Sequence, residues 1–246
     1  MYNSIDSVVG SYSSFPKVSY NDVACCSSYK SPIFSADDVS YSPADFAGVS
    51  YTNSAYSSSK ISSAKNYVSH SVFVNPYAGR TVFVGDAESI KDFAEEAFLA
   101  TTGKELPSGI IISVCSEDKM KDFHPGWHPG IEGFSINTHP KMVFVKRGEL
   151  ARVMATLGHE LGHVVSSPLR SDVDEEAKAF SFELAWIRAI KENNIGNLAK
   201  NLVIPEPAHN NLHDVALDFV LKEVGNDVNP LDLFWKLSLG DSSVDV

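Results

Sequence analysis

The segment between Gly148 and Pro168 constrains the fold of this chain more than any other stretch of its sequence. At 100° per residue its apolar residues fall within about 100° of arc, and these are Leu150, Val153, Met154, Leu157, Leu161 and Val164. Because glycine and proline bound the pattern, it predicts a helix of about 18 residues that buries this apolar face. This helix is therefore expected to pack its apolar face against the core.

The same helix carries an H-E-x-x-H motif, His159-Glu160-Leu161-Gly162-His163. Residues four apart lie one turn above each other, so both imidazoles can bind one zinc ion while Glu160 points toward a metal-bound water. On the wheel both histidines lie roughly opposite Leu157, which predicts that they face a cleft. A bare match in a chain of this composition arises by chance with a probability of roughly one to two per cent. The alternative is a surface helix with two unrelated histidines.

A catalytic zinc site needs a third protein ligand, and the next predicted helix offers two carboxylates. That helix begins at Asp172, which with Glu175 has capping-box spacing, and Asp174 and Glu175 are expected to serve the cap. Its apolar face carries Glu176 and Glu183, which is unexpected because buried acids are normally paired or bound to metal. Glu176, in the first turn, is the predicted ligand. Glu183 is the alternative ligand, or a group that orients one imidazole.

The remaining patterns upstream predict strands and one helix. Residues 71–75 and 81–85 flank an Asn-Pro-Tyr-Ala-Gly-Arg turn and predict a β-hairpin. Residues 87–101 predict an amphipathic helix that ends near Gly103. Further strands are predicted at 108–115, 133–137 and 141–146, a loop at 124–130, and helices from Glu149 onward. Strands with one helix, followed by a helical half, predict an α+β domain.

The first 70 residues differ sharply in composition from the rest. They hold 20 serines and eight of the nine tyrosines but only nine charged residues, without helical or strand periodicity. We expect residues 1–70 to be a largely disordered tail and residues 71–246 to form one domain. A binding or delivery segment and an autoinhibitory pro-segment are the alternatives for the tail.

The two motif-bearing helices resemble a known family. ATLGHELGHVV (155–165) followed by DEEAKAFSFELAW (174–186) is similar to the ImmA/IrrE-like metallopeptidases, in the gluzincin group of zincins. The family pattern is a T-L-A-H-E-L-G-H helix and then E-A-x-x-F-A-x-E-L. The matching positions are Thr156 to His163, then Glu176, Ala177, Phe180, Glu183 and Leu184. The chain departs from the pattern at Gly158, where alanine is usual, and at Lys178, where asparagine is frequent. No helix-turn-helix module accompanies the match, so the family's link to repressor cleavage is not carried over.

The resemblance, which covers roughly residues 130–187, implies a small zincin-like domain with a mixed sheet, an active-site helix and a substrate-binding edge strand before it. It also implies a zinc-dependent endopeptidase that uses one Zn²⁺ ion, with Glu160 as the general base, on a protein or peptide substrate. For the oxyanion donor we consider Tyr77, His209 and His213. The simpler interpretation of the two histidines is ordinary polar surface. The competing function is a non-catalytic, zinc-braced or partner-binding protein that interacts through its tail.

Charge and composition exclude other classes. The chain has 31 acidic and 20 basic residues, a net charge of −11, which argues against a general nucleic-acid binder. No apolar run reaches the length of a membrane span, and no secretory signal is visible, so a cytoplasmic location is the default expectation. Delivery by a route that needs no signal peptide is the alternative. The three cysteines, Cys25, Cys26 and Cys115, predict neither a disulfide scaffold nor a cysteine-based zinc site.

Overall fold

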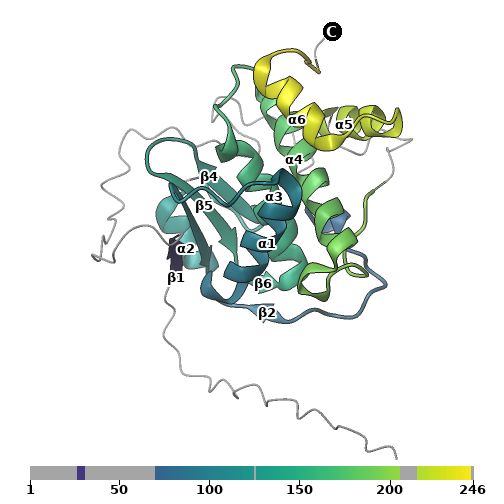
Figure 1. Cartoon of the computed structure of the whole chain (residues 1–246). Coiled ribbons are helices and arrows are strands. Elements are labelled where there is room, and N and C mark those ends of the chain that lie inside the picture. Colours follow the sequence, from purple (N-terminus) through teal and green to yellow (C-terminus); the bar gives the residue numbers. More distant parts are fainter. Residues whose placement is uncertain (1–26, 31–69, 125, 206–214, 245–246) are drawn as a thin grey trace, which may run out of the picture.

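The protein has a mixed α/β architecture of small sheets and helices (Figure 1). A computed structural model describes residues 27–30, 70–124, 126–205 and 215–244. Within these residues six α-helices accompany one four-stranded and one two-stranded sheet. Strands dominate the first half of the described chain and helices the second, as the sequence predicts.

The larger sheet has the order β1-β3-β5-β4 and is mixed. Its strands are β1 (Ser27–Lys30), β3 (Ile110–Cys115), β4 (Gly133–Ile136) and β5 (Lys141–Lys146). The central pair β3 and β5 is parallel, whereas β1 and β4 pair antiparallel with their neighbours and form the two edges. All six residues of β3 are buried, as its continuous apolar run predicts. The predicted strands within 108–115, 133–137 and 141–146 are confirmed.

Two long helices occupy the centre of the molecule. Helix α3 (Leu150–Val165) lies on β4 and β5, and α4 (Asp172–Asn193) packs against α3 on its other side. Around α4 lie α1 (Lys91–Thr102), α5 (Val215–Gly225) and α6 (Pro230–Leu239). Figure 1 shows α3 between the sheet and α4. The main hydrophobic core fills the space between the sheet and these helices, so α3 is its central element.

A second, smaller core covers the opposite face of the sheet. It contains Met120 of α2 (Glu117–Phe123), together with Phe134 and Phe144, whose rings stack with centroids 4.6 Å apart. The short helix α2 was not expected from the sequence, because its few apolar residues give too little periodicity to detect. Both faces of the sheet are therefore covered, and β4 is buried although it is an edge strand.

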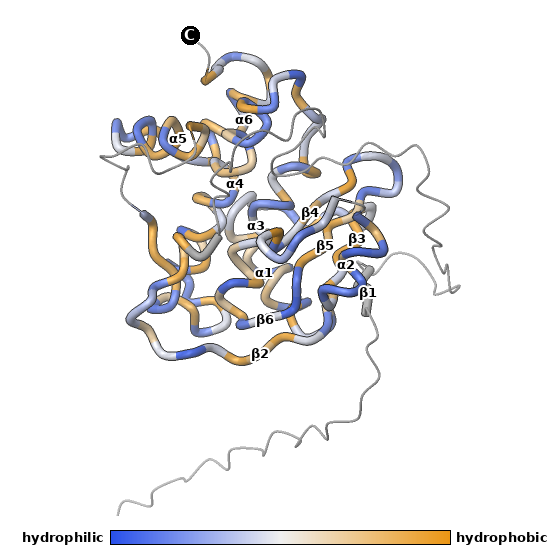
Figure 2. Tube along the Cα trace, turned by 180° about the vertical axis from the view of Figure 1, so that it is seen from behind, coloured by the Kyte–Doolittle hydropathy of each residue, from blue (hydrophilic) through white to orange (hydrophobic). Residues whose placement is uncertain are grey.

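The predicted hairpin over 71–85 is wrong. Residues His70–Phe73 form a short 3-10 helix, and β2 (Phe83–Val84) pairs with β6 (Gly148–Glu149) just before α3. Two short apolar runs flanking a turn met the local signal for a hairpin, but the partner of β2 comes from 65 residues further along the chain. Figure 2 shows hydrophobic residues along β2, where Phe83 is largely exposed.

The N-terminal region does contribute to the fold. Strand β1 lies within the predicted disordered tail and pairs with β3, with Ser27 opposite Val114. The sequence analysis predicted a largely disordered tail and did not anticipate a strand at these four residues. The rest of that prediction lies outside the described residues, and the domain boundary at residue 70 stays a prediction.

Cys115, the last residue of β3, is disulfide-bonded. The other two cysteines of the chain, Cys25 and Cys26, lie outside the described residues. The sequence analysis predicted no disulfide scaffold and did not anticipate this single bond, because cysteine number and spacing carry no information about distances in the fold. Within the described residues, no helix is both long enough and apolar enough to cross a lipid bilayer.

Candidate metal centre

Helices α3 and α4 approach closely because glycine faces α4 at two positions of α3. A Cβ atom at Gly158 would lie 2.5 Å from Trp186 Cδ1, and one at Gly162 would lie 2.8 Å from the Cα atom of Ala179. The Trp186 indole donates a hydrogen bond of 2.8 Å to the carbonyl of Met154, which fixes the two helices relative to each other. This contact brings the first turns of α4 beside the last turns of α3.

Three side chains from these two helices converge. His159 Nε2 lies 3.3 Å from His163 Nε2 and 3.4 Å from Glu176 Oε2, and His163 Nε2 lies 3.9 Å from Glu176 Oε1. The three side chains offer ligand atoms that all lie within 4.8 Å of one another. Ligand atoms that are about 2.0–2.1 Å from a tetrahedral zinc ion lie roughly 3.3–3.4 Å apart. The cluster could therefore hold a metal ion.

Each imidazole is held from behind by a second carboxylate. His159 Nδ1 lies 3.1 Å from Glu183 Oε2, and His163 Nδ1 lies 2.8 Å from Glu175 Oε1. A carboxylate accepts the Nδ1–H proton, which leaves the lone pair on Nε2. Two imidazole lone pairs and the Glu176 carboxylate then point at one another, and a cation between them relieves the repulsion. The chemistry and arrangement of these side chains therefore suit a divalent metal ion.

The electrostatics of His159 show the same demand for positive charge. Burial is the strongest single influence and lowers its pKa, but hydrogen bonds to Glu176 and Glu183 and the charges of both outweigh it. Together they raise the pKa of His159 from 6.5 to about 10. For Glu175, burial is also the strongest single influence, and it raises the pKa of this carboxyl group. The hydrogen bond and charge of His163, followed by those of Lys178, outweigh burial and hold the pKa of Glu175 below its ordinary value.

Glu160 lies at the contact between α3 and the edge strand β4. A Cβ atom on Gly133 would lie 2.9 Å from Glu160 Cγ and 3.0 Å from its Oε1, so only glycine fits there. The side chain of Glu160 is fully buried. The first residue of the edge strand therefore touches the predicted general base.

The expectation that the histidine face of α3 opens onto a cleft does not match the burial. His159, Glu160 and His163 are all 0% exposed, and 14 of the 16 residues of α3 are buried. A helical wheel places polar residues on the outer side, but the acidic residues of α4 supply partners that allow this face to be buried as well. Helix α4 thus covers the polar face of α3.

The acidic residues at the start of α4 do not serve the cap as predicted. The N-cap residue is Ser171, whose hydroxyl accepts a hydrogen bond from the Asp174 amide. The Asp174 carboxylate instead accepts hydrogen bonds from Ser243 and Val244 near the C-terminus. Glu175 binds His163, a role that the sequence analysis missed. The three-residue spacing of Glu175 and Lys178 signals the ion pair between these two residues, but it gives no signal for the contact of Glu175 with His163.

The candidate oxyanion donors are not brought to the cluster within the described residues. Tyr77 lies in the loop between the 3-10 helix His70–Phe73 and β2, and 95% of it is exposed. His209 and His213 lie outside the described residues. The oxyanion donor stays unassigned.

Comparison with protein families, with curated proteins and with solved structures finds no match. The resemblance to the ImmA/IrrE-like metallopeptidases therefore stays a prediction from the two helices. Both departures from that pattern have a structural reason in this protein. Gly158 leaves room for Trp186, and Lys178 pairs with Glu175 at 2.8 Å.

Proposed function

We propose that this protein is a zinc-dependent endopeptidase that hydrolyses peptide bonds of a protein substrate. The observation that carries the proposal is the convergence of His159, His163 and Glu176, with each imidazole oriented by a further carboxylate. A glutamate next to the first histidine, at the edge of a sheet, adds the acid–base group that hydrolysis requires.

His159, His163 and Glu176 would hold the zinc ion, which when bound supplies Lewis-acid chemistry by acidifying water and polarising a carbonyl. Glu160 accepts the proton from the attacking water and returns it to the leaving amine. Glu183 and Glu175 keep each imidazole in the tautomer that presents Nε2. These roles use only residues of α3 and α4.

The edge strand β4 favours a peptide as substrate. Within the described residues β5 is the one strand that pairs with β4. Because all four residues of β4 are buried, an extended peptide would add to its outer side through main-chain hydrogen bonds only after the covering segments move aside. Gly133 on this strand touches Glu160, so a peptide on this edge would pass beside the general base. This placement suits an extended backbone better than a compact small molecule.

Two measurements on the purified protein test the proposal. Metal analysis should find about one zinc per chain in the parent and a loss of zinc in His163→Ala. A peptide-library cleavage assay should then show activity in the parent and at least a 100-fold loss in Glu160→Gln, which keeps its zinc. A Glu160→Gln variant that cleaves as fast as the parent would rule out this residue as the base.

The second candidate function is a non-catalytic protein in which zinc only braces α3 and α4. The complete burial of both imidazoles and of Glu160 favours it. A structural zinc site usually has four protein ligands, and the described cluster offers three residues. In this case Glu160→Gln would keep both its zinc and its stability, and no peptide would be cleaved by the parent.

A further inference from the structure

We propose that Lys178 is a positioning residue of the metal centre, which acts through Glu175 on the His163 imidazole. This inference rests on the proposed metal site and goes beyond it, because Lys178 touches neither the ligand atoms nor the general base in the contacts described above. It assigns a task to a lysine that is fully buried in the first turns of α4.

The ammonium group of Lys178 joins two segments of the chain. Its Nζ atom donates to Glu175 Oε2 at 2.8 Å and to the carbonyl of Ser167 at 3.1 Å. Ser167 follows the end of α3, so one ammonium group connects the segment after α3 to the start of α4. A lysine is rarely buried unless it is paired, and here both contacts satisfy donors that would otherwise be costly.

The Glu175 carboxylate is held at both oxygens. Oε1 lies 2.8 Å from His163 Nδ1, while Oε2 accepts from Lys178 and, at 2.7 Å, from the amide of Leu169. Removing the ammonium group takes away the charged donor that fixes Oε2. The Leu169 amide then remains as the described donor to Oε2, so the carboxylate is held less firmly, and His163 loses part of the constraint that selects the tautomer with a free Nε2.

Lys141 offers a matched control for this effect. Like Lys178 it is a lysine that donates to a main-chain carbonyl at the end of α3, in this case that of Val164. Its ammonium group contacts that carbonyl and not Glu175. Replacing either lysine by methionine removes one charge near the same helix end and keeps most of the side-chain volume. Only the change at Lys178 should disturb the histidine.

The experiment measures zinc affinity by competition with a chromophoric chelator, in the full-length chain. We expect Lys178→Met to weaken zinc binding about 10- to 100-fold, and Lys141→Met to change it less than about threefold. Glu175→Gln should weaken it about as much, and adding Lys178→Met to Glu175→Gln should cause little further loss, because both act on one path. Lys178→Gln keeps an uncharged donor group and should fall between the parent and Lys178→Met.

A second readout does not need the metal. Long-range ¹H–¹⁵N spectra of the metal-free protein report the tautomer of His163, which we expect to be the single Nδ1–H form in the parent and a mixture in Lys178→Met.

The inference is overturned if Lys178→Met and Lys178→Gln keep both the parent's zinc affinity and this tautomer. It is also overturned if Lys141→Met weakens zinc binding equally, or if the losses in the double variant add. If the parent binds no zinc, the proposed function fails, while the spectra still test the link from Lys178 to His163.

Discussion

Four glutamates lie near two histidines in this protein, and position alone gives them different tasks. Glu176 faces the Nε2 atoms of both imidazoles, whereas Glu183 and Glu175 face the two Nδ1 atoms. Glu160 belongs to α3 itself and lies beside Gly133. A carboxylate at Nε2 shares a cation with the imidazole, and one at Nδ1 orients the ring.

Single substitutions can therefore separate a ligand from an orienting group. Glu176→Ala should remove a ligand and weaken zinc binding by at least 1,000-fold, whereas Glu183→Gln should weaken it about 10- to 100-fold because the ring stays in place. Zinc titration against a competing chelator measures both. Equal losses in the two variants would mean that Glu183 shares the ligand role.

At the residue scale, the three clustered side chains could be predicted from the sequence, but the carboxylate that contacts His163 could not. Helical spacing placed His159 and His163 on one face and selected Glu176 on the next helix, and these three form the cluster. The partner of His163 could not be found in this way. Glu175 reaches it only because the segment after α3 turns the start of α4 toward the helix end, which is a tertiary effect.

At the scale of elements, the contact between α3 and α4 depends on a glycine and a tryptophan. Gly158 lies against Trp186, which is fully buried and bonded to the Met154 carbonyl. The proposed metal ligands are distributed over these two helices, so the separation of the helices sets the ligand geometry. A methyl group at residue 158 would force the helices apart or displace the indole.

Gly158→Ala should therefore destabilise the protein by about 1–3 kcal/mol, although alanine is the better helix former. The comparison is Gly225→Ala in the last turn of α5, where a Cβ atom meets nothing within 4 Å. Urea unfolding of both variants measures the difference. A Gly158→Ala protein as stable as the parent would show that Trp186 moves at little cost.

Local patterns predicted elements well where neighbours in sequence pair, and poorly elsewhere. Strands β4 and β5 are joined by a short turn, and α1 ends at Gly103 in a left-handed conformation, as the sequence indicates. Strand β2 pairs with β6, which is distant in sequence. Strand β1 comes from the serine-rich N-terminal region and pairs with β3, more than 80 residues later. Such pairings depend on the assembled core, because a run of two to four residues carries too little pattern.

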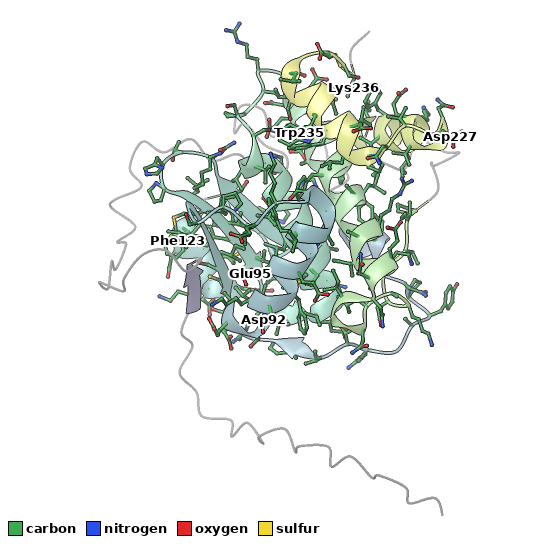
Figure 3. All side chains as sticks on the ribbon, in the orientation of Figure 1. Asp92, Glu95, Phe123, Asp227, Trp235 and Lys236 are labelled. Carbon is green, nitrogen blue, oxygen red and sulfur yellow. The ribbon has the colours of Figure 1, made fainter. Side chains whose placement is uncertain are left out.

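At the scale of the whole molecule, the acidic charge belongs to residues 71–246, which carry 26 acidic and 16 basic residues. Part of this acidic charge lies outside the core, where Asp92 and Glu95 project from α1 (Figure 3). Figure 3 also labels Trp235 and the basic residue Lys236 on α6. Another part is inside, in the glutamates of the metal centre. The proposed divalent cation would offset this internal charge, so metal binding and stability should be coupled.

Deletion of residues 1–69 tests how far the site depends on the N-terminal region. The deletion removes β1 and exposes an edge of β3, so we expect a lower unfolding temperature and more self-association. Zinc stoichiometry should stay at about one, since the ligands come from α3 and α4. Deletion of residues 1–24 keeps β1 and all three cysteines and is the control. Loss of zinc from the longer deletion alone would show that the region supports the site.

Removal of the metal should weaken the fold without unfolding it. The main core packs the sheet against α3 and α4 through large apolar side chains such as Phe182 and Trp186, so the metal-free chain retains most of its buried surface. Zinc that binds only the native state adds about 2.7 kcal/mol at a free concentration 100 times its dissociation constant. Thermal melts should therefore show a cooperative transition in a chelator and a higher one with zinc. The zinc-dependent increase should vanish in His163→Ala. A chain that is unfolded in the chelator would instead make zinc essential for folding, as in small zinc-dependent domains.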